Sequence, residues 1–213
     1  EISARLQIPA DISEEGTILV SGRLLAEICR SLPSAPVDVE TDGSKVTLTC
    51  RNSRFNLATM PVSEYPELPA LPDVSGVVDG DAFAQAVSQV IIAASRDDTL
   101  PILTGVRMEI EDDLITFLAT DRYRLALREL PWKPATPGIS TSALVKAKTL
   151  NEVAKTLGSG GDLNIALSGD SELIGFESGG RRTTSLLVDG DYPKIRSLFP
   201  ENTPIHATVE THA

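Results

Sequence analysis

Apolar residues recur with a helical period in three stretches of the chain. In each stretch they fall three or four positions apart, as Leu150, Val153 and Leu157 do. This spacing gathers the apolar side chains in one stripe of a helix and leaves a polar stripe for solvent or a partner. The pattern therefore predicts amphipathic helices over residues 20–32, 81–95 and 145–157.

Short runs between these helices alternate apolar and polar residues, as half-buried strands do. Residues 37–40 and 46–49 are two such runs on either side of an Asp-Gly turn, which is a hairpin signature. Hairpins of the same kind are predicted over residues 110–115 and 163–176. Because strands outnumber helices, each helix must lie across one face of an antiparallel sheet. We therefore predict an α+β architecture.

One helix and its strands occur twice in the chain. Leu25 corresponds to Leu150, an offset of 125 residues, and the Tyr-Pro pair at residues 65–66 recurs at residues 192–193. A repeat of this length indicates an array of similar domains. Such arrays build extended surfaces or rings more often than enclosed catalytic pockets.

The repeat predicts where the domains begin and end. Residues 1–72 are expected to form the C-terminal half of one domain with its linker, and residues 73–193 a complete domain of two similar halves. Residues 194–213 are expected to form a linker and the first strand of a third copy. Prolines in both linkers keep the chain extended and outside the sheets. On this interpretation the chain is part of a longer array.

Composition and charge exclude some classes of protein. Hydrophobic residues make up 41% of the chain and charged residues 23%, as in ordinary globular proteins. No apolar run approaches the ~20 residues that a membrane helix needs. Cys29 and Cys50 lack metal-ligand spacing and are expected to be small buried residues in a reducing compartment. The net charge of −11 argues against a simple nucleic-acid binder, unless the basic residues share one face.

The sequence contains no recognisable catalytic arrangement. Gly158 begins a glycine-rich run like a phosphate loop, but the run follows a predicted helix, where a glycine suits a left-handed cap. His206 and His212, the only histidines, lack a cysteine partner or a repeated carboxylate spacing. The adjacent aspartates at 97–98 and 112–113 would point to opposite faces of a strand, so we expect them in turns.

Residues 118–127 are the most informative stretch, because a strand ends there in a polar turn and a second strand follows. From the residues alone, an ordinary hairpin accounts for this pattern. However, Ala-Thr-Asp-Arg-Tyr-Arg-Leu-Ala at residues 119–126 resembles the Ala-Thr-Asp-x-x-Arg-Leu-Ala signature of the bacterial DNA sliding clamp, the β subunit of DNA polymerase III. Residues 99–106 resemble the Pro-x-Leu-x-Gly segment of its second domain, and residues 188–193 resemble the end of that domain. The resemblance is actinobacterial-like and covers essentially the whole chain in register.

The resemblance implies the clamp fold, in which two three-domain chains close into a ring with helices around the hole. Duplex DNA would pass through the hole and be held topologically, without sequence-specific contacts. The residues that would face the DNA are Arg23, Arg30, Lys146, Lys148 and Lys155. Lys148 and Lys155 are seven positions apart and so share a helix face, as Arg23 and Arg30 do. An ordinary solvated helix face is the alternative interpretation of these residues.

The resemblance also implies a pocket for short peptides of partner proteins, among them the α subunit of DNA polymerase III, the clamp loader and other DNA enzymes. The matching positions are Leu103, Thr120, Arg122, Tyr123, Arg124, Leu125, Pro193, Ser197 and Leu198. Arg122 and Tyr123 are bulkier than the small residue and the histidine often found in this turn. Ser197 stands where a basic residue is often found. We expect these departures to change the peptide preference.

The resemblance further implies a cytoplasmic, non-catalytic protein without cofactor or metal, which is a homodimer when intact. We expect the 213-residue chain by itself to be a monomer. Two other classes of function stay open at this point. One is a peptide-binding adaptor of the same fold that does not encircle DNA, and the other is a small hydrolase that uses Asp97 or Asp121.

Overall fold

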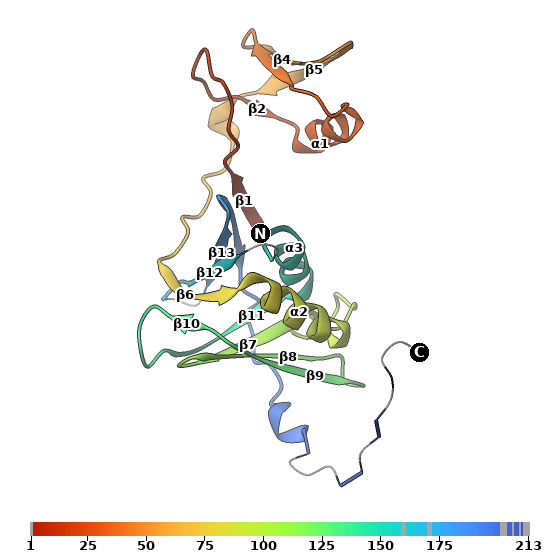
Figure 1. The fold of residues 1–213 in the computed structure, drawn as a ribbon, viewed down its shortest axis with the longest axis vertical. Helices are drawn as coiled ribbons and strands as arrows, with labels where there is room; N and C mark the ends of the chain where they lie inside the picture. The colour runs from red at the N-terminus through yellow and green to blue at the C-terminus, as the bar shows by residue number, and fades with distance from the viewer. Residues whose placement is uncertain are drawn as a thin grey trace. The chain divides into compact units, whose positions relative to one another are not determined.

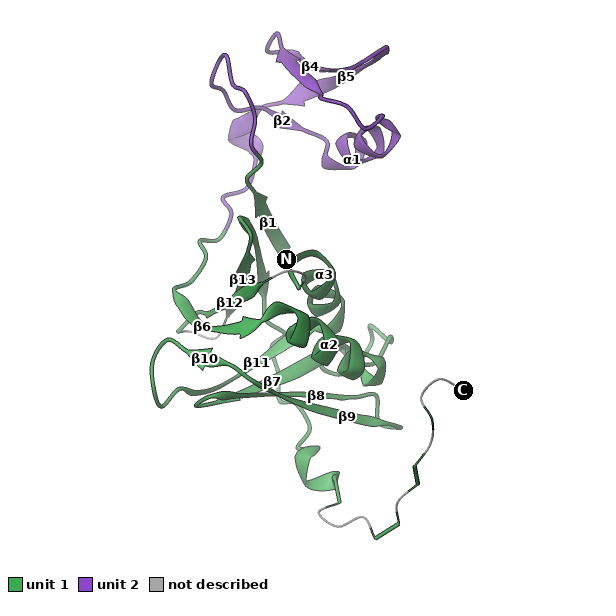
Figure 2. Cartoon of the chain, in the orientation of Figure 1, with its two compact units in different colours: residues 1–8, 69–213 green, residues 9–68 purple. Residues whose placement is uncertain are grey.

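A computed structural model describes residues 2–158, 161–169, 172–200, 204–205, 207–208 and 210. The chain forms two compact units (Figure 2). The larger unit comprises residues 1–8 and 69–213, and the smaller unit comprises residues 9–68. Residues 204–205, 207–208 and 210 are in neither helix nor strand, and the two histidines lie outside the described residues.

The larger unit is built from two halves, and in each half a strand and a helix are followed by at least three further strands. The first half contains β6 (Val74–Asp79), α2 (Gly80–Val90), η2 (Ile91–Ala93), η3 (Pro101–Thr104), β7 (Gly105–Glu111), β8 (Leu114–Thr120), β9 (Leu125–Pro131) and β10 (Lys133–Pro134). The second half contains β11 (Ser140–Lys146), α3 (Ala147–Leu157), β12 (Asp162–Leu167), β13 (Leu173–Ser178) and β14 (Arg181–Leu186). The predicted α+β architecture, with hairpins at β7–β8 and β12–β13, is confirmed.

The two halves exchange their first strands. One sheet has the order β11-β7-β8-β9, so the first strand of the second half pairs with the first half. The other sheet has the order β1-β14-β13-β12-β6-β10, in which β6 from the first half pairs with β12. This exchange ties the halves into one structure around a common core.

The two helices α2 and α3 lie beside each other against the sheets (Figure 1). Their apolar stripes enter a core to which both sheets contribute. At its centre, Phe83 of α2 is fully buried between Phe117 of β8 and Phe176 of β13, with ring centroids 5.8 Å apart in both pairs. Three aromatic rings therefore join one helix to both sheets.

The glycine at the end of α3 serves a purpose other than the one predicted. Gly158 has a φ of −77°, so it is not the left-handed cap that we expected. A β-carbon at this position would lie 2.8 Å from the β-carbon of Ala84, which belongs to α2. The glycine is needed because α2 approaches closely there and because the carbonyl oxygen of Ala154, in the preceding helix, would also lie closer to a β-carbon than van der Waals contact allows. The next two residues of the glycine-rich run lie outside the described residues.

The first strand of the chain belongs to the larger unit. β1 (Ile2–Leu6) pairs antiparallel with β14, with Ile2 opposite Ser185 and Leu6 opposite Arg181. It thus forms the edge of the six-stranded sheet, although it is separated from β14 by most of the chain.

The smaller unit repeats the layout of one half. It contains β2 (Leu19–Val20), α1 (Gly22–Ser31), β3 (Asp38–Thr41), β4 (Lys45–Cys50), β5 (Ser53–Met60) and η1 (Val62–Glu64). Its sheet has the order β2-β5-β4-β3. Ser21 caps α1, since its hydroxyl accepts a hydrogen bond from the amide of Leu24.

Only one of the two cysteines is buried as predicted. Cys50 is buried, and its thiol donates to the carbonyl oxygens of Pro33 and Ala35. Cys29 on α1 is exposed, so the prediction was wrong for this residue. Within the unit α1 packs against one small sheet only and buries no residue completely, whereas α3 also packs against α2.

None of the helices in the described part of the chain is long and apolar enough to cross a membrane.

Candidate functional site

The turn between β8 and β9 is held by the side chains of its first two residues. The hydroxyl of Thr120 donates to the carbonyl oxygen of Arg124 (2.9 Å) and accepts from the amide of Arg122 (3.0 Å). The Asp121 carboxylate accepts from the amides of Tyr123 and Arg124 and from the Arg124 guanidinium (2.9 Å). Arg122 has a φ of +80°, a conformation that a bulky side chain rarely adopts. The predicted hairpin turn is therefore held by a local network of hydrogen bonds.

The acids near this turn are held in their charged form. Burial acts to raise the pKa of Asp121, but the hydrogen bonds from Tyr123 and Arg124 outweigh it and leave the pKa below its ordinary value. The pKa of Asp97 is also lowered, chiefly by hydrogen bonds from Thr99 and in addition by the charge of Arg122. A carboxylate with a lowered pKa is a poor general base at neutral pH. The lowered pKa values therefore argue against Asp97 or Asp121 as the general base of a hydrolase.

The strand before the turn is buried on both faces. Phe117 and Ala119 point into the main core, whereas Leu118 belongs to a second apolar cluster on the opposite face of the sheet. The buried members of this outer cluster are Leu118, Leu144, Tyr192 and Ile195, and its partly buried members are Ile102, Leu125, Leu127, Val188 and Phe199. Two-sided burial explains why β8 is nearly uniformly apolar instead of alternating.

The segment after β14 covers this outer cluster. Val188 donates a backbone hydrogen bond to Leu144 on β11 (2.8 Å), and the amide of Thr120 donates to the Tyr192 hydroxyl (3.0 Å). Ile195 is buried, and the short helix η4 (Arg196–Leu198) follows it. Residues 188–199 thus lie on the sheet β11-β7-β8-β9, although the preceding strand belongs to the other sheet.

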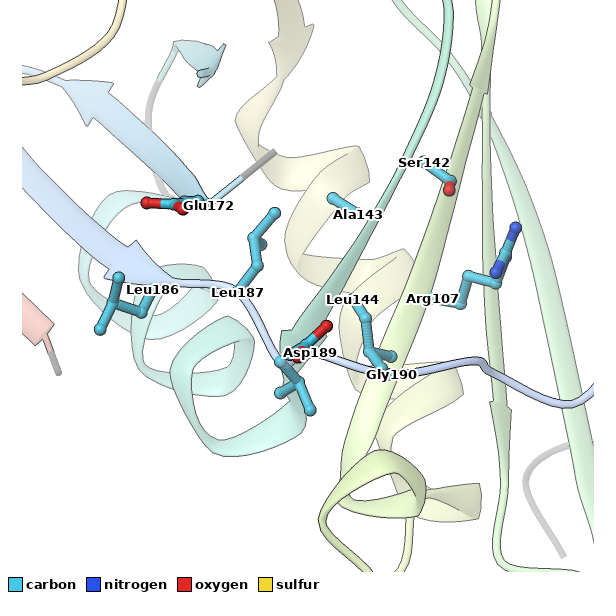
Figure 3. A pocket seen from close by; sticks show the side chains of 10 residues that line it. Arg107, Ser142, Ala143, Leu144, Glu172, Leu186, Leu187, Asp189 and Gly190 are labelled. Atoms are coloured by element: carbon cyan, nitrogen blue, oxygen red, sulfur yellow. The ribbon is translucent and has the colours of Figure 1, made fainter. Parts of the chain in front are cut away.

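Two cavities flank this covering segment. One, of about 780 Å³, is lined by Pro193 and Ser197 together with Leu118, Ile195, Arg196 and other residues of both elements. The other, of about 600 Å³, lies where residues 186–190 leave β14 and pass along β11, with the side chains of Leu144 and Arg107 on its wall (Figure 3). Arg107 contributes to both.

The structure places the nine predicted pocket residues at three places around the outer cluster. Thr120, Arg122, Tyr123, Arg124 and Leu125 form the turn and the start of β9, where Leu125 packs on the cluster and Tyr123 is 92% exposed. Pro193, Ser197 and Leu198 belong to the covering segment, and Leu198 is 63% exposed. Leu103 is buried in η3, next to cluster residue Ile102.

Sequence reasoning missed three residues of this surface. Tyr192, Ile195 and Arg196 fasten the covering segment to the sheet. The repeated Tyr-Pro pair was a signal for Tyr192, but the pattern alone did not indicate that its hydroxyl reaches Thr120.

The five predicted DNA-facing residues are all on exposed positions of α1 and α3 or just before α3. Arg23 pairs with Glu27 at 3.1 Å and Lys155 with Glu152 at 3.9 Å, both within one helix. Exposed ion pairs of this kind contribute little to stability, so Arg23 and Lys155 can readily pair with another anion in place of the glutamate. A cavity of about 770 Å³ beside the start of α3 adds Arg96 to Lys146 and Lys148 on its lining.

Among the described residues, no three His, Cys, Asp or Glu side chains gather as metal ligands would.

Tyr192 makes stability depend on pH in the alkaline range. Burial raises the pKa of its hydroxyl to about 12, although the Thr120 amide and the Arg107 charge act in the opposite direction. The pKa of an unfolded tyrosine is about 10. The folded state thus favours the neutral phenol. The contribution of Tyr192 to the free energy of unfolding is fully present below about pH 10 and is lost as the pH rises through about 12. We expect the free energy of unfolding to fall by about 2–3 kcal/mol over this window.

The control is Tyr192→Phe, which cannot ionise at this position. Urea unfolding at several pH values, followed by the fluorescence of Trp132, should show a smaller alkaline loss of stability for this variant than for wild type. An equal loss in both proteins would contradict the prediction. Trp132 is the only tryptophan of the chain and is buried in the core of the larger unit.

Comparison with known proteins places these features in one family. The model of the N-terminal domain of the DNA polymerase III beta subunit matches residues 1–69, and the model of its central domain matches residues 77–194. The chain is 68% identical to the beta sliding clamp of Micrococcus luteus over 213 residues, which is 69% of that protein. It is 56% identical to the beta sliding clamp of Streptomyces coelicolor and spans 57% of its length.

Solved structures give the same result. The sliding clamp of Bacillus subtilis superimposes with a TM-score of 0.81 at 29% identity, covering 94% of this chain and 55% of the clamp. The Pseudomonas aeruginosa clamp bound to griselimycin superimposes with a TM-score of 0.84 at 25% identity, covering 96% of this chain and 56% of the clamp. The family expected from the sequence motifs is confirmed: the chain belongs to the DNA polymerase III beta subunit family, the beta sliding clamps.

Proposed function

We propose that these 213 residues are part of a sliding clamp, a non-catalytic subunit that encircles duplex DNA and tethers a replicative polymerase to it. The observation that carries this proposal is the exposed face of α3. One side of the helix is buried in the core, and the other presents Lys148 and Lys155. At the same offset of 125 residues, α1 presents Arg23 and Arg30. A repeated pair of cations on one helix face is what a ring needs along its inner wall.

The charge distribution supports retention of the DNA by a ring that encloses it, without tight or sequence-specific contacts. The net charge of −11 would repel DNA from most of the surface, while the basic helix faces attract phosphates. Contacts to phosphates carry no sequence information, so the DNA could slide past them. The ring itself requires further clamp domains, which we propose are arranged as three domains in each of two subunits.

We also propose that the outer cluster and the cavity next to it bind short peptides of partner proteins. The surface combines an apolar floor at Leu125 with exposed Leu198 and polar groups on the turn. Such a surface suits one or two apolar anchor side chains of a peptide. The clamp of Pseudomonas aeruginosa has been solved with griselimycin bound, which supports ligand binding by the family. The polymerase α subunit and the clamp loader are the partners that we propose.

The test is retention of the three-domain protein on DNA after loading. On nicked circular DNA the protein should stay bound through a high-salt wash, and cutting the circle once should release it. In direct binding, Lys148→Glu with Lys155→Glu should weaken the affinity for duplex DNA and lower the salt slope by about 2. Lys133→Glu, a charge reversal on exposed β10, is the matched control and should behave as wild type.

Equal release from circular and linear DNA would contradict the encircling function. Peptide binding without retention would instead support an adaptor of the same fold.

A further inference from the structure

The exposed end of the covering segment is attached to the sheet by one arginine. Arg196, the first residue of η4, donates from Nη1 to Glu109 on β7 at 3.3 Å and from Nη2 to Glu129 on β9 at 3.2 Å. The two glutamates are separated from Arg196 by 87 and 67 residues in the sequence. The guanidinium therefore bridges two strands that do not pair with each other.

The sheet register shows why both glutamates reach the same guanidinium. Glu109 of β7 is opposite Thr116 of β8, and Thr116 is opposite Glu129 of β9. The three residues form one row across the sheet, on the face that carries the outer cluster. Because β8 lies between them, β7 and β9 are about 10 Å apart, a span that one guanidinium can bridge when the two glutamate side chains reach toward it. Glu109 also accepts from Arg107 at 2.9 Å, which leaves it between two guanidinium groups.

The residues that follow Ile195 are held differently from those before it. Tyr192 and Ile195 anchor the start of the segment by burial, but beyond Ile195 the side chains of η4 are exposed. Leu198 is 63% exposed, so burial does not hold it in place. Its amide donates to the carbonyl oxygen of Ile195, and the amide of Phe199 donates to that of Arg196. Phe199, the next residue, is partly buried against the outer cluster. Within η4 itself, the side chain that bonds to the sheet is that of Arg196.

We propose that Arg196 is a positioning residue of the peptide-binding surface, which holds Ser197 and Leu198 in place through Glu109 and Glu129. The inference rests on the peptide-binding function proposed above. The bridge is half exposed, so it contributes little to global stability. Its effect should appear in peptide affinity, because a turn that is in place only part of the time lowers the apparent affinity by that fraction.

The experiment measures the affinity of a labelled peptide, Gln-Leu-Asp-Leu-Phe, for the three-domain protein by fluorescence anisotropy. Arg196→Gln should weaken binding about fivefold, if the turn is in place about a fifth of the time. Arg196→Lys, which can pair with one glutamate, should recover part of this loss. Glu129→Gln should weaken binding in wild type but have no further effect in the Arg196→Gln background, because the two act through one bridge.

Arg182→Gln is the matched control. It breaks the 2.8 Å pair between Arg182 and Glu177, which has similar exposure in the same unit but lies away from the peptide surface. It should leave the peptide affinity unchanged, and all variants should keep the thermal midpoint of wild type within a few degrees.

A change of less than twofold in Arg196→Gln, or an additive effect of Glu129→Gln, would overturn the inference while the peptide site itself stands. No binding by wild type would overturn both the inference and the proposed site. A large fall in the thermal midpoint of Arg196→Gln would show that the bridge is structural and would also overturn the positioning role.

Discussion

Replacing Phe83 with alanine is expected to lower the free energy of unfolding by about 3–5 kcal/mol. The ring is fully buried and contacts Phe117 and Phe176, one from each sheet. Its removal would lose the transfer free energy of the side chain and leave a cavity that close-packed neighbours can fill only partly. Aromatic contacts on two sides add to this loss.

Denaturant unfolding followed by Trp132 fluorescence measures this effect. Since the chain has two compact units, a probe confined to the larger one is needed, and Trp132 lies in the same core as Phe83. Phe83→Leu is the conservative control, with an expected cost below about 1.5 kcal/mol. A loss of less than about 1 kcal/mol in Phe83→Ala would show that the three rings are not the centre of the core.

Placing an aspartate at Leu125 is expected to weaken peptide binding by at least about 100-fold, or about 2.7 kcal/mol. Leu125 packs on the outer cluster at the start of β9, where a bound peptide would cover it. A carboxylate at this position would be desolvated by the peptide without a partner charge, which is costly. The apolar floor is also where an anchor side chain gains most of its affinity.

Anisotropy titration of the labelled peptide with wild type and Leu125→Asp measures this loss. Leu6→Asp is the control, because Leu6 is 55% exposed on β1 and belongs to the same unit. It should bind the peptide as wild type does, and both variants should keep the Trp132 emission of the folded protein. Unchanged affinity in Leu125→Asp would place the peptide elsewhere.

Much of the fold could be predicted from periodicity because the patterns are local. The three helices begin and end within a few residues of their predicted limits, except that the helix expected over 81–95 ends at Val90 and continues as η2. Hairpin turns with Asp and Gly were predictable for the same reason. The exposure of Cys29 was not predictable, because an apolar stripe predicts which side of a helix can be buried but not whether another element covers it.

The peptide surface was only partly accessible to such reasoning. The turn could be predicted because it depends on neighbouring residues: the side chains of Thr120 and Asp121 form hydrogen bonds with backbone groups two to four positions away. The covering segment is positioned by Tyr192 and Arg196, whose partners lie 67 to 87 residues earlier in the chain. No periodic signal connects such distant positions.

The sequence by itself therefore determined the helices, the hairpins, the repeat and the family, since each of these depends on short-range patterns or on motifs. Tertiary structure alone decided that β6 and β11 exchange between halves, that β1 completes the sheet at β14, and that one guanidinium bridges two strands. The physical reason is that strand pairing and ion pairing are formed between any surfaces that the folded chain brings together. Their free energy depends on distance in space, which hydrophobic periodicity along the chain does not specify.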